Sequence, residues 1–217
     1  MSSLARIFLL ALATFLCLPA AAQVVYENGP INGRVDAWTI NFGLIVSDTF
    51  TISGGATTVT GVSFGAWLFQ GDTLSSVEVD ITSMENGGTT FFDQVVSFTS
   101  DGCTLNQYGF NVCQETGVFS GPQLNNGTYW LNLENASVPS GDPVYWDENS
   151  GIGCHSVGCP SQPSENAGGS IPAESFSILG STASSTSTTA TVPEPGSLML
   201  FASGVLGLGA IVRRKLR

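Results

Sequence analysis

The chain has 217 residues and a formal net charge of −11, because 6 lysines and arginines stand against 17 aspartates and glutamates. A chain so poor in basic residues lacks the positive face that nucleic-acid phosphates require, so we expect no nucleic acid as a partner. The 42% hydrophobic content and the 26 glycines also exclude a disordered chain and a coiled coil. Between Gln23 and Val192, Arg34 is the only lysine or arginine. Because nearly all of the aspartates and glutamates also lie there, this stretch is strongly acidic.

Residues 1–22 have the pattern of a secretory signal peptide. Arg6 supplies the positive start, Ile7–Leu18 is an uninterrupted apolar run, and the small residues after it end at Ala22. As a helix the apolar run would measure only about 18 Å, which is too short to cross a bilayer. We therefore expect export through the Sec pathway and cleavage by signal peptidase between Ala22 and Gln23.

The central region, residues 23–180, has the pattern of short β-strands. Val77, Val79 and Ile81 alternate with polar residues, which is the two-residue period of a half-buried strand. Turn signals such as Asn86-Gly87-Gly88 separate the candidate strands, and no helical period is sustained. This pattern predicts an all-β domain, an antiparallel β-sandwich that is jelly-roll-like. The other expected strands are Trp38–Phe42, Asp48–Ile52, Val59–Phe69, Thr90–Thr99, Tyr129–Leu133 and Ser175–Leu179.

Four cysteines remain once the signal peptide is removed: Cys103, Cys113, Cys154 and Cys159. An even number in an exported domain indicates two disulfides, and three pairings are open. We favour the local pairs, Cys103–Cys113 and Cys154–Cys159, because each closes a loop in turn-rich sequence. The competing interpretation is a zinc site, although the spacings do not match common zinc-binding motifs.

Polar and aromatic residues concentrate in the segment 141–159, which makes it the candidate ligand site. The residues that would contact a ligand are Asp142, Tyr145, Trp146, Asp147 and Glu148. Aromatic rings can stack on sugars, and oxygen-rich loops hold Ca²⁺, so the candidate ligands are a carbohydrate and a structural calcium ion. The alternative is that the two aromatic rings pack the segment onto the domain while the acids face water.

Signatures of catalysis are weak, and we predict that the protein is not an enzyme and has no catalytic residues. A Ser-His-Asp triad would have to use the only histidine, His155, which has no nucleophile-elbow motif near it. Asp147 and Glu148 are adjacent, so on a strand they point to opposite faces and do not flank one glycosidic bond. A hydrolase of matrix polysaccharides is the remaining enzymatic alternative. Apart from a structural calcium ion, we expect no cofactor and no metal site.

The C-terminal part contains a Ser/Thr-rich linker, residues 181–191, followed by a tripartite tail, residues 192–217. The tail begins with Pro193-Glu194-Pro195, continues with an uncharged apolar stretch over 196–212 and ends with the basic residues 213–217. The apolar stretch is at the short limit for a single transmembrane helix, and the basic end should remain cytoplasmic by the positive-inside rule. The linker is expected to be a solvated stalk.

This tail resembles the PEP-CTERM sorting signal of Gram-negative bacteria that make extracellular polysaccharide. The resemblance covers about an eighth of the chain, and all three parts of the signal are present in order. It implies that an exosortase recognises Pro193, Glu194 and Pro195. It also implies an inner-membrane precursor facing the periplasm that is then transferred to the cell surface or the extracellular matrix.

Together these observations predict an exported surface or matrix protein with a structural or interaction role in exopolysaccharide or biofilm. The alternative is a carbohydrate- or calcium-binding module that uses the segment Tyr145–Glu148. The expected partners are the exosortase, the Sec machinery and signal peptidase during export, the inner membrane through the C-terminal helix, and extracellular polysaccharide.

Overall fold

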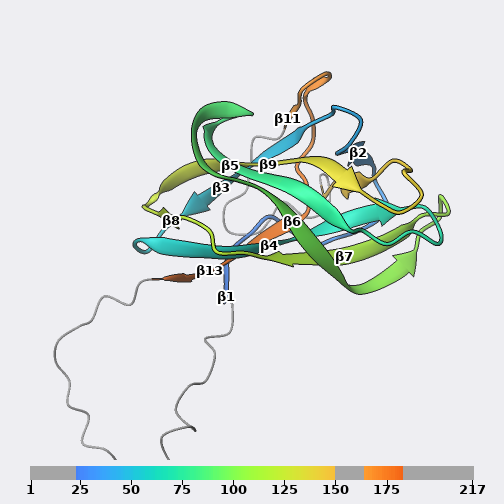
Figure 1. Ribbon diagram of the computed structural model, residues 1–217, viewed down its shortest axis with the longest axis horizontal. Helices are drawn as coiled ribbons and strands as arrows, with labels where there is room; N and C mark the ends of the chain where they lie inside the picture. The colour runs from blue at the N-terminus through green and yellow to red at the C-terminus, as the bar shows by residue number, and fades with distance from the viewer. Residues whose placement is uncertain (1–22, 150–163, 183–217) are drawn as a thin grey trace, which may run out of the picture. The chain divides into compact units, whose positions relative to one another are not determined.

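Strands and turns make up the part of the chain that the structure describes. The computed structural model describes residues 23–149 and 164–182 (Figure 1), and every regular element in those two ranges is a β-strand. Within them there is no helix with the length and apolar character that a membrane crossing requires. The signal peptide, the linker beyond Thr182 and the membrane helix predicted over 196–212 lie outside the described residues. The strands are β1 (Gln23–Glu27), β2 (Ala37–Thr39), β3 (Val46–Ile52), β4 (Thr57–Leu68), β5 (Ser76–Met84), β6 (Gly87–Leu105), β7 (Asn111–Val118), β8 (Gln123–Leu124), β9 (Gly127–Ser137), β10 (Tyr145–Asp147), β11 (Ser164–Glu165), β12 (Gly169–Ser170) and β13 (Phe176–Thr182).

The strands form two layers that share one long strand. The hydrogen-bonded order is β1-β13-β4-β7-β6 in the first layer and β6-β5-β9-β3-β11-β12 in the second. β6 belongs to both layers because its first part pairs with β5 and its last part pairs with β7, as Figure 1 shows. All pairings between these strands are antiparallel, which confirms the predicted all-β antiparallel class. The sandwich is therefore one sheet that curls on itself.

The core lies between the two layers and follows the two-residue period of the sequence. Val77, Val79 and Ile81 of β5 are all buried, as their alternation predicts. Tyr26 of β1 meets Phe50 of β3 with 6.1 Å between ring centroids, and this contact joins the free edge of the first layer to the second. The predicted turn at Asn86 is also confirmed, because Asn86 has a positive φ of 42° between β5 and β6.

The C-terminal strand is longer than the sequence suggested. β13 continues through Ser181 and Thr182, which pair with Thr58 and Thr57 of β4. These two residues belong to the stretch that the sequence analysis assigned to the linker, starting at residue 181. Backbone hydrogen bonds between strands do not require apolar side chains. The end of this strand was therefore not predicted, because its Ser and Thr residues resemble those of the linker. Six strands had no counterpart among the predicted ones: β1, β7, β8, β10, β11 and β12.

A disulfide joins Cys103 of β6 to Cys113 of β7, with 4.0 Å between the two Cα atoms. The cysteines are direct cross-strand partners in the antiparallel register, so the bond closes the hairpin between β6 and β7. This confirms the first predicted disulfide and removes two of the four thiolates that a zinc site would use. The second predicted pair, Cys154–Cys159, lies outside the described residues, as does His155.

Candidate functional site

The aromatic residue expected to stack on a ligand, Trp146, is part of the core. It lies in β10, is fully buried, and packs edge-on against Phe64 and Phe176, with centroid distances of 6.0 and 5.5 Å. Its indole N–H donates to the carbonyl oxygen of Ser175 at 2.9 Å. A buried indole offers no face to a sugar, so the prediction of Trp146 as a ligand-contacting residue is wrong. The alternative interpretation, in which this aromatic ring packs the segment onto the domain, describes Trp146 correctly.

Asp147, the next residue, ties β10 to the loop that follows β1. Its carboxylate accepts hydrogen bonds from the backbone N–H groups of Asn32 and Gly33, at 2.8 and 2.9 Å, and from the indole of Trp67 at 2.6 Å. The Ser175 hydroxyl makes a fourth bond at 3.2 Å. Burial raises the pKa of Asp147, and these hydrogen bonds act in the opposite direction. With both oxygens engaged, Asp147 is a structural anchor.

A glycine makes the close approach around Asp147 feasible. A Cβ on Gly65 of β4 would lie 2.6 Å from the Ser175 hydroxyl oxygen and 2.8 Å from the Asp147 Cβ. Those distances are shorter than real Cβ contacts, so any other residue at this position would push β10 away from β4. The anchor therefore depends on the absence of a side chain at Gly65.

The remaining residues of the predicted ligand site are divided between two places. Tyr145 is half-buried and packs edge-on against Phe110, at 5.6 Å between centroids, and burial followed by the charge of Asp142 raises its pKa. Asp142 lies in the loop before β10, where its carbonyl oxygen accepts a bond from the Asn41 side chain at 3.1 Å. Glu148, at the other end of β10, is buried and faces a different set of residues. The structure does not bring the five residues together into one ligand site.

The group around Glu148 is acidic and was missed by the sequence analysis. Glu148 forms an antiparallel bridge with Glu174, and Glu174 is fully buried. Burial raises the pKa of Glu174 well above its ordinary value, and the charges of four nearby carboxylates add to the effect. We call these five residues the Glu174 group. Its members are Asp36, Asp48, Asp147, Glu148 and Glu174.

A second acidic group lies on the outer face of β5 and β6. Carboxylate oxygens of Glu78, Asp80 and Asp93 all lie within 4.8 Å of one another, close enough to share a cation. Burial and then the charge of Asp93 raise the pKa of Asp80 to about 7. Asp93 is exposed and the other two are partly exposed, although Oδ1 of Asp80 is itself buried without a hydrogen-bond partner. This group is the candidate metal-holding set on the surface of the domain.

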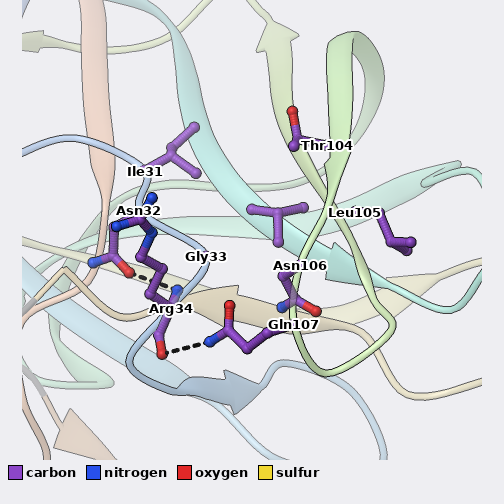
Figure 2. Close-up of a pocket in the computed structure, with 9 residues that line it drawn as sticks. Ile31, Asn32, Gly33, Arg34, Thr104, Leu105, Asn106 and Gln107 are labelled. Atoms are coloured by element: carbon purple, nitrogen blue, oxygen red, sulfur yellow. Dashed lines mark hydrogen bonds between the residues drawn. The ribbon is translucent and has the colours of Figure 1, made fainter.

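A cavity of about 360 Å³ opens between the segments 31–34 and 104–107. Its lining includes Asn32 and Gly33, whose backbone N–H groups donate to Asp147. Figure 2 shows the segment 31–34 on one side and the segment 104–107 on the other, with Gln107 reaching across to Arg34. The Gln107 side-chain amide donates to the Arg34 carbonyl oxygen at 3.0 Å. Next to this cavity, Tyr108 is 58% exposed, and its ring is stacked on Trp67 at 5.8 Å between centroids. Amide side chains and Arg34 therefore line the opening, and an exposed tyrosine lies beside it.

The comparisons with known proteins concern the C-terminal tail. Residues 191–215 match the family model described as the PEP-CTERM protein-sorting motif. The match includes Pro193, Glu194 and Pro195, so the predicted resemblance is confirmed and the chain carries a PEP-CTERM sorting motif. No curated protein matches the chain. The matched residues lie outside the described part of the structure, and so does Ala22 at the predicted signal-peptidase site.

The motif supports sorting of this chain as an exosortase substrate, exported and held by its C-terminus before processing. It covers residues 191–215 only, and the β-domain lies upstream of it. The role of the domain after sorting therefore depends on its own surface.

Proposed function

We propose that this protein is a non-enzymatic component of the extracellular polysaccharide matrix, delivered by the exosortase route and displayed on or released from the cell surface. The observation that carries the proposal is the match to the PEP-CTERM motif over residues 191–215. The domain supports it in two ways. A curled antiparallel sandwich with a hairpin disulfide suits an oxidising exterior, and the strong excess of acidic residues keeps a displayed domain soluble.

The physical role of the motif follows from its residues. Pro193 and Pro195 both favour extended backbone and prevent a helix from propagating upstream out of the apolar stretch. Glu194 is then presented between them as a single charge on an accessible strand. In this proposal the triplet is the substrate of the processing enzyme and takes no part in catalysis.

Substitution of Glu194 tests the route directly. In the native host, Glu194→Gln should leave unprocessed precursor in the inner membrane, because the recognition segment loses its one charge. Cell fractionation followed by immunoblotting measures the distribution. Glu27→Gln is the matched control, since Glu27 is an exposed glutamate of β1 outside the tail. Normal release of the Glu194→Gln variant would contradict the sorting role.

We further infer that the domain contacts matrix polysaccharide at the cavity between segments 31–34 and 104–107. The supporting observation is the exposed ring of Tyr108, whose hydroxyl donates to the Arg34 carbonyl oxygen at 3.4 Å and so lies beside the opening. Saccharide sites combine an aromatic platform with amide and charged groups that bond hydroxyls. Because the domain is strongly acidic, it would repel a polyanion, and the ligand class that fits is a neutral polysaccharide.

Affinity electrophoresis of the full chain through a gel containing dextran, a neutral glucan, tests this contact. Retardation by dextran is expected, with none by polygalacturonate, and Tyr108→Ala should weaken binding about fivefold to tenfold. Phe42→Ala is the control because Phe42 is an even more exposed aromatic residue, at 68% against 58% for Tyr108, that does not line this cavity. Unchanged retardation of Tyr108→Ala, or equal retardation of both variants, would reject the cavity as the contact site.

A further inference from the structure

We propose that the Glu174 group binds a calcium ion, with the carboxylates of Glu174 and Glu148 as its protein ligands. The inference is independent of the proposed matrix function, because it rests on buried groups inside the domain. It also differs from the ligand site expected from the sequence, since neither Trp146 nor Tyr145 takes part.

The first observation is that Glu174 is buried without a partner for its side chain. The residue has 0% exposure, and neither of its carboxylate oxygens accepts a hydrogen bond. Its backbone, in contrast, is fully used. The N–H donates to Asp48 Oδ2 at 2.9 Å, and the carbonyl oxygen accepts from the side chains of Asn28 and Asn149, both at 2.8 Å. A rigidly held carboxylate that has no donor is costly in a dry interior, unless a cation or a proton neutralises it.

The second observation is the direction in which Glu174 points. Glu148 and Glu174 are direct partners in an antiparallel bridge, and residues paired in this way project their side chains to the same face. Glu148 is held in place by the indole N–H of Trp38, which donates to Oε2 at 3.2 Å. A further buried oxygen, Oδ1 of Asn149, also lacks a donor. The groups left without a partner at this place are therefore oxygen acceptors.

The third observation is the charge balance. Asp48, Glu148, Asp147 and Asp36 all act on Glu174, and each raises its pKa in addition to the effect of burial. The only lysine or arginine between Gln23 and Val192 is Arg34, and its charge is not among those that act on Glu174. Among the described residues, the three carboxylates whose oxygens lie within 4.8 Å of one another are those of Glu78, Asp80 and Asp93, so the whole Glu174 group does not act as one ligand set. The oxygens offered to a cation at this place are those of Glu174, Glu148 and the Asn149 amide.

Calcium is the ion that fits this donor set. It takes six to eight oxygen ligands in a flexible geometry and tolerates a mixture of carboxylates, amides and water, whereas magnesium requires near-ideal octahedral geometry. An exported protein also meets calcium at concentrations that suit the weak sites of extracellular modules, with dissociation constants on the order of 10⁻⁴–10⁻³ M.

The chain contains two matched controls. Glu115 of β7 is also buried at 1% exposure with both carboxylate oxygens unpartnered, but only one acidic neighbour, Asp101, acts on it. Asp80 belongs to the surface acidic group, where three carboxylates lie close together but remain partly exposed. Glu115→Gln therefore changes a buried glutamate outside the proposed site. Asp80→Asn disables the other candidate cation site.

The experiment uses the full chain purified in detergent and stripped with EDTA. Thermal unfolding is followed with added Ca²⁺ or Mg²⁺, and binding is measured with Tb³⁺, a calcium analogue whose luminescence Trp38 would sensitise from beside Glu148. At about 100-fold excess over the dissociation constant, Ca²⁺ should raise the melting temperature by about 5–10 °C. Glu174→Gln should weaken Ca²⁺ and Tb³⁺ binding at least about tenfold. Glu115→Gln and Asp80→Asn should retain the binding of the unmodified chain.

Three results would overturn the proposal. The unmodified chain could show no shift with Ca²⁺, which would mean that a proton neutralises Glu174. The shift could persist in Glu174→Gln, or it could disappear in Asp80→Asn, and either result would place the ion elsewhere. In EDTA, Glu174→Gln should melt at or above the temperature of the unmodified chain, because it removes one charge from an acidic group; this confirms that the variant is folded.

Discussion

Glu174 and Glu115 are two buried glutamates without hydrogen-bond partners for their carboxylates, and their surroundings differ. Glu115 lies in β7 between β4 and β6, where burial and then the charge of Asp101 raise its pKa to about 7. Glu174 lies between β12 and β13, is bridged to Glu148 next to β10, and has four carboxylates acting on it. A proton alone can neutralise Glu115 near neutral pH. Glu174 has four acidic neighbours instead of one, and this difference is the basis of the calcium proposal.

Asp147 extends this comparison, because it belongs to the Glu174 group and yet needs no ion. Backbone and side-chain donors surround both of its oxygens. The same end of the domain therefore contains one carboxylate satisfied by protein donors and another with none. The calcium proposal concerns only the second carboxylate, which has both no donor and several acidic neighbours.

The largest effect is expected from Asp147→Ala. The substitution would leave the buried indole N–H of Trp67 and the backbone N–H of Gly33 without acceptors, and would also detach the loop after β1. Losing bonds to a charged acceptor of this kind costs about 3–5 kcal/mol in total, which urea unfolding of the full chain measures.

Asp142→Ala is the control for this prediction, because it removes an acid nearby whose carboxylate is not part of the anchor. It should change stability by less than about 0.5 kcal/mol. Similar losses in the two variants would show that Asp147 is no more than a surface acid.

A smaller effect, dependent on pH, is expected from Glu115→Gln. The folded-state pKa of Glu115 is raised from 4.5 to about 7, so its contribution to stability is fully present below pH 4.5 and is lost as the pH rises through 7. The variant should therefore be less sensitive to pH than the unmodified chain between pH 5 and about 8. Urea midpoints across this range measure the difference, and parallel curves for the two proteins would contradict the assignment.

Sequence patterns predicted the regular parts of the fold well, since those parts depend on local periodicity. The alternation of Val77, Val79 and Ile81 identified β5, and the spacing of Cys103 and Cys113 identified the hairpin disulfide. β10 was missed because three residues are too few to show a period, and the acids beside Trp146 suggested exposure. Its burial comes from Phe64 and Phe176, which lie far away in the sequence.

The Glu174 group could not be predicted from the sequence for the same reason. Asp48, Glu148 and Glu174 belong to three separate segments, and only the pairing of strands brings them together. Glu174 itself stands in a short segment between β12 and β13 that has no recognisable motif. The tail, in contrast, is a linear signal that works through its order along the chain, so the sequence alone was sufficient to identify it.

The measurement that tests the central claim most directly is the intact mass of the protein isolated from its native host, before and after reduction. The account predicts a mature chain that starts at Gln23, lacks the apolar and basic residues 196–217, and contains the Cys103–Cys113 bond. A soluble cytoplasmic protein that keeps residues 1–22 and 196–217, with its thiols reduced, would contradict it.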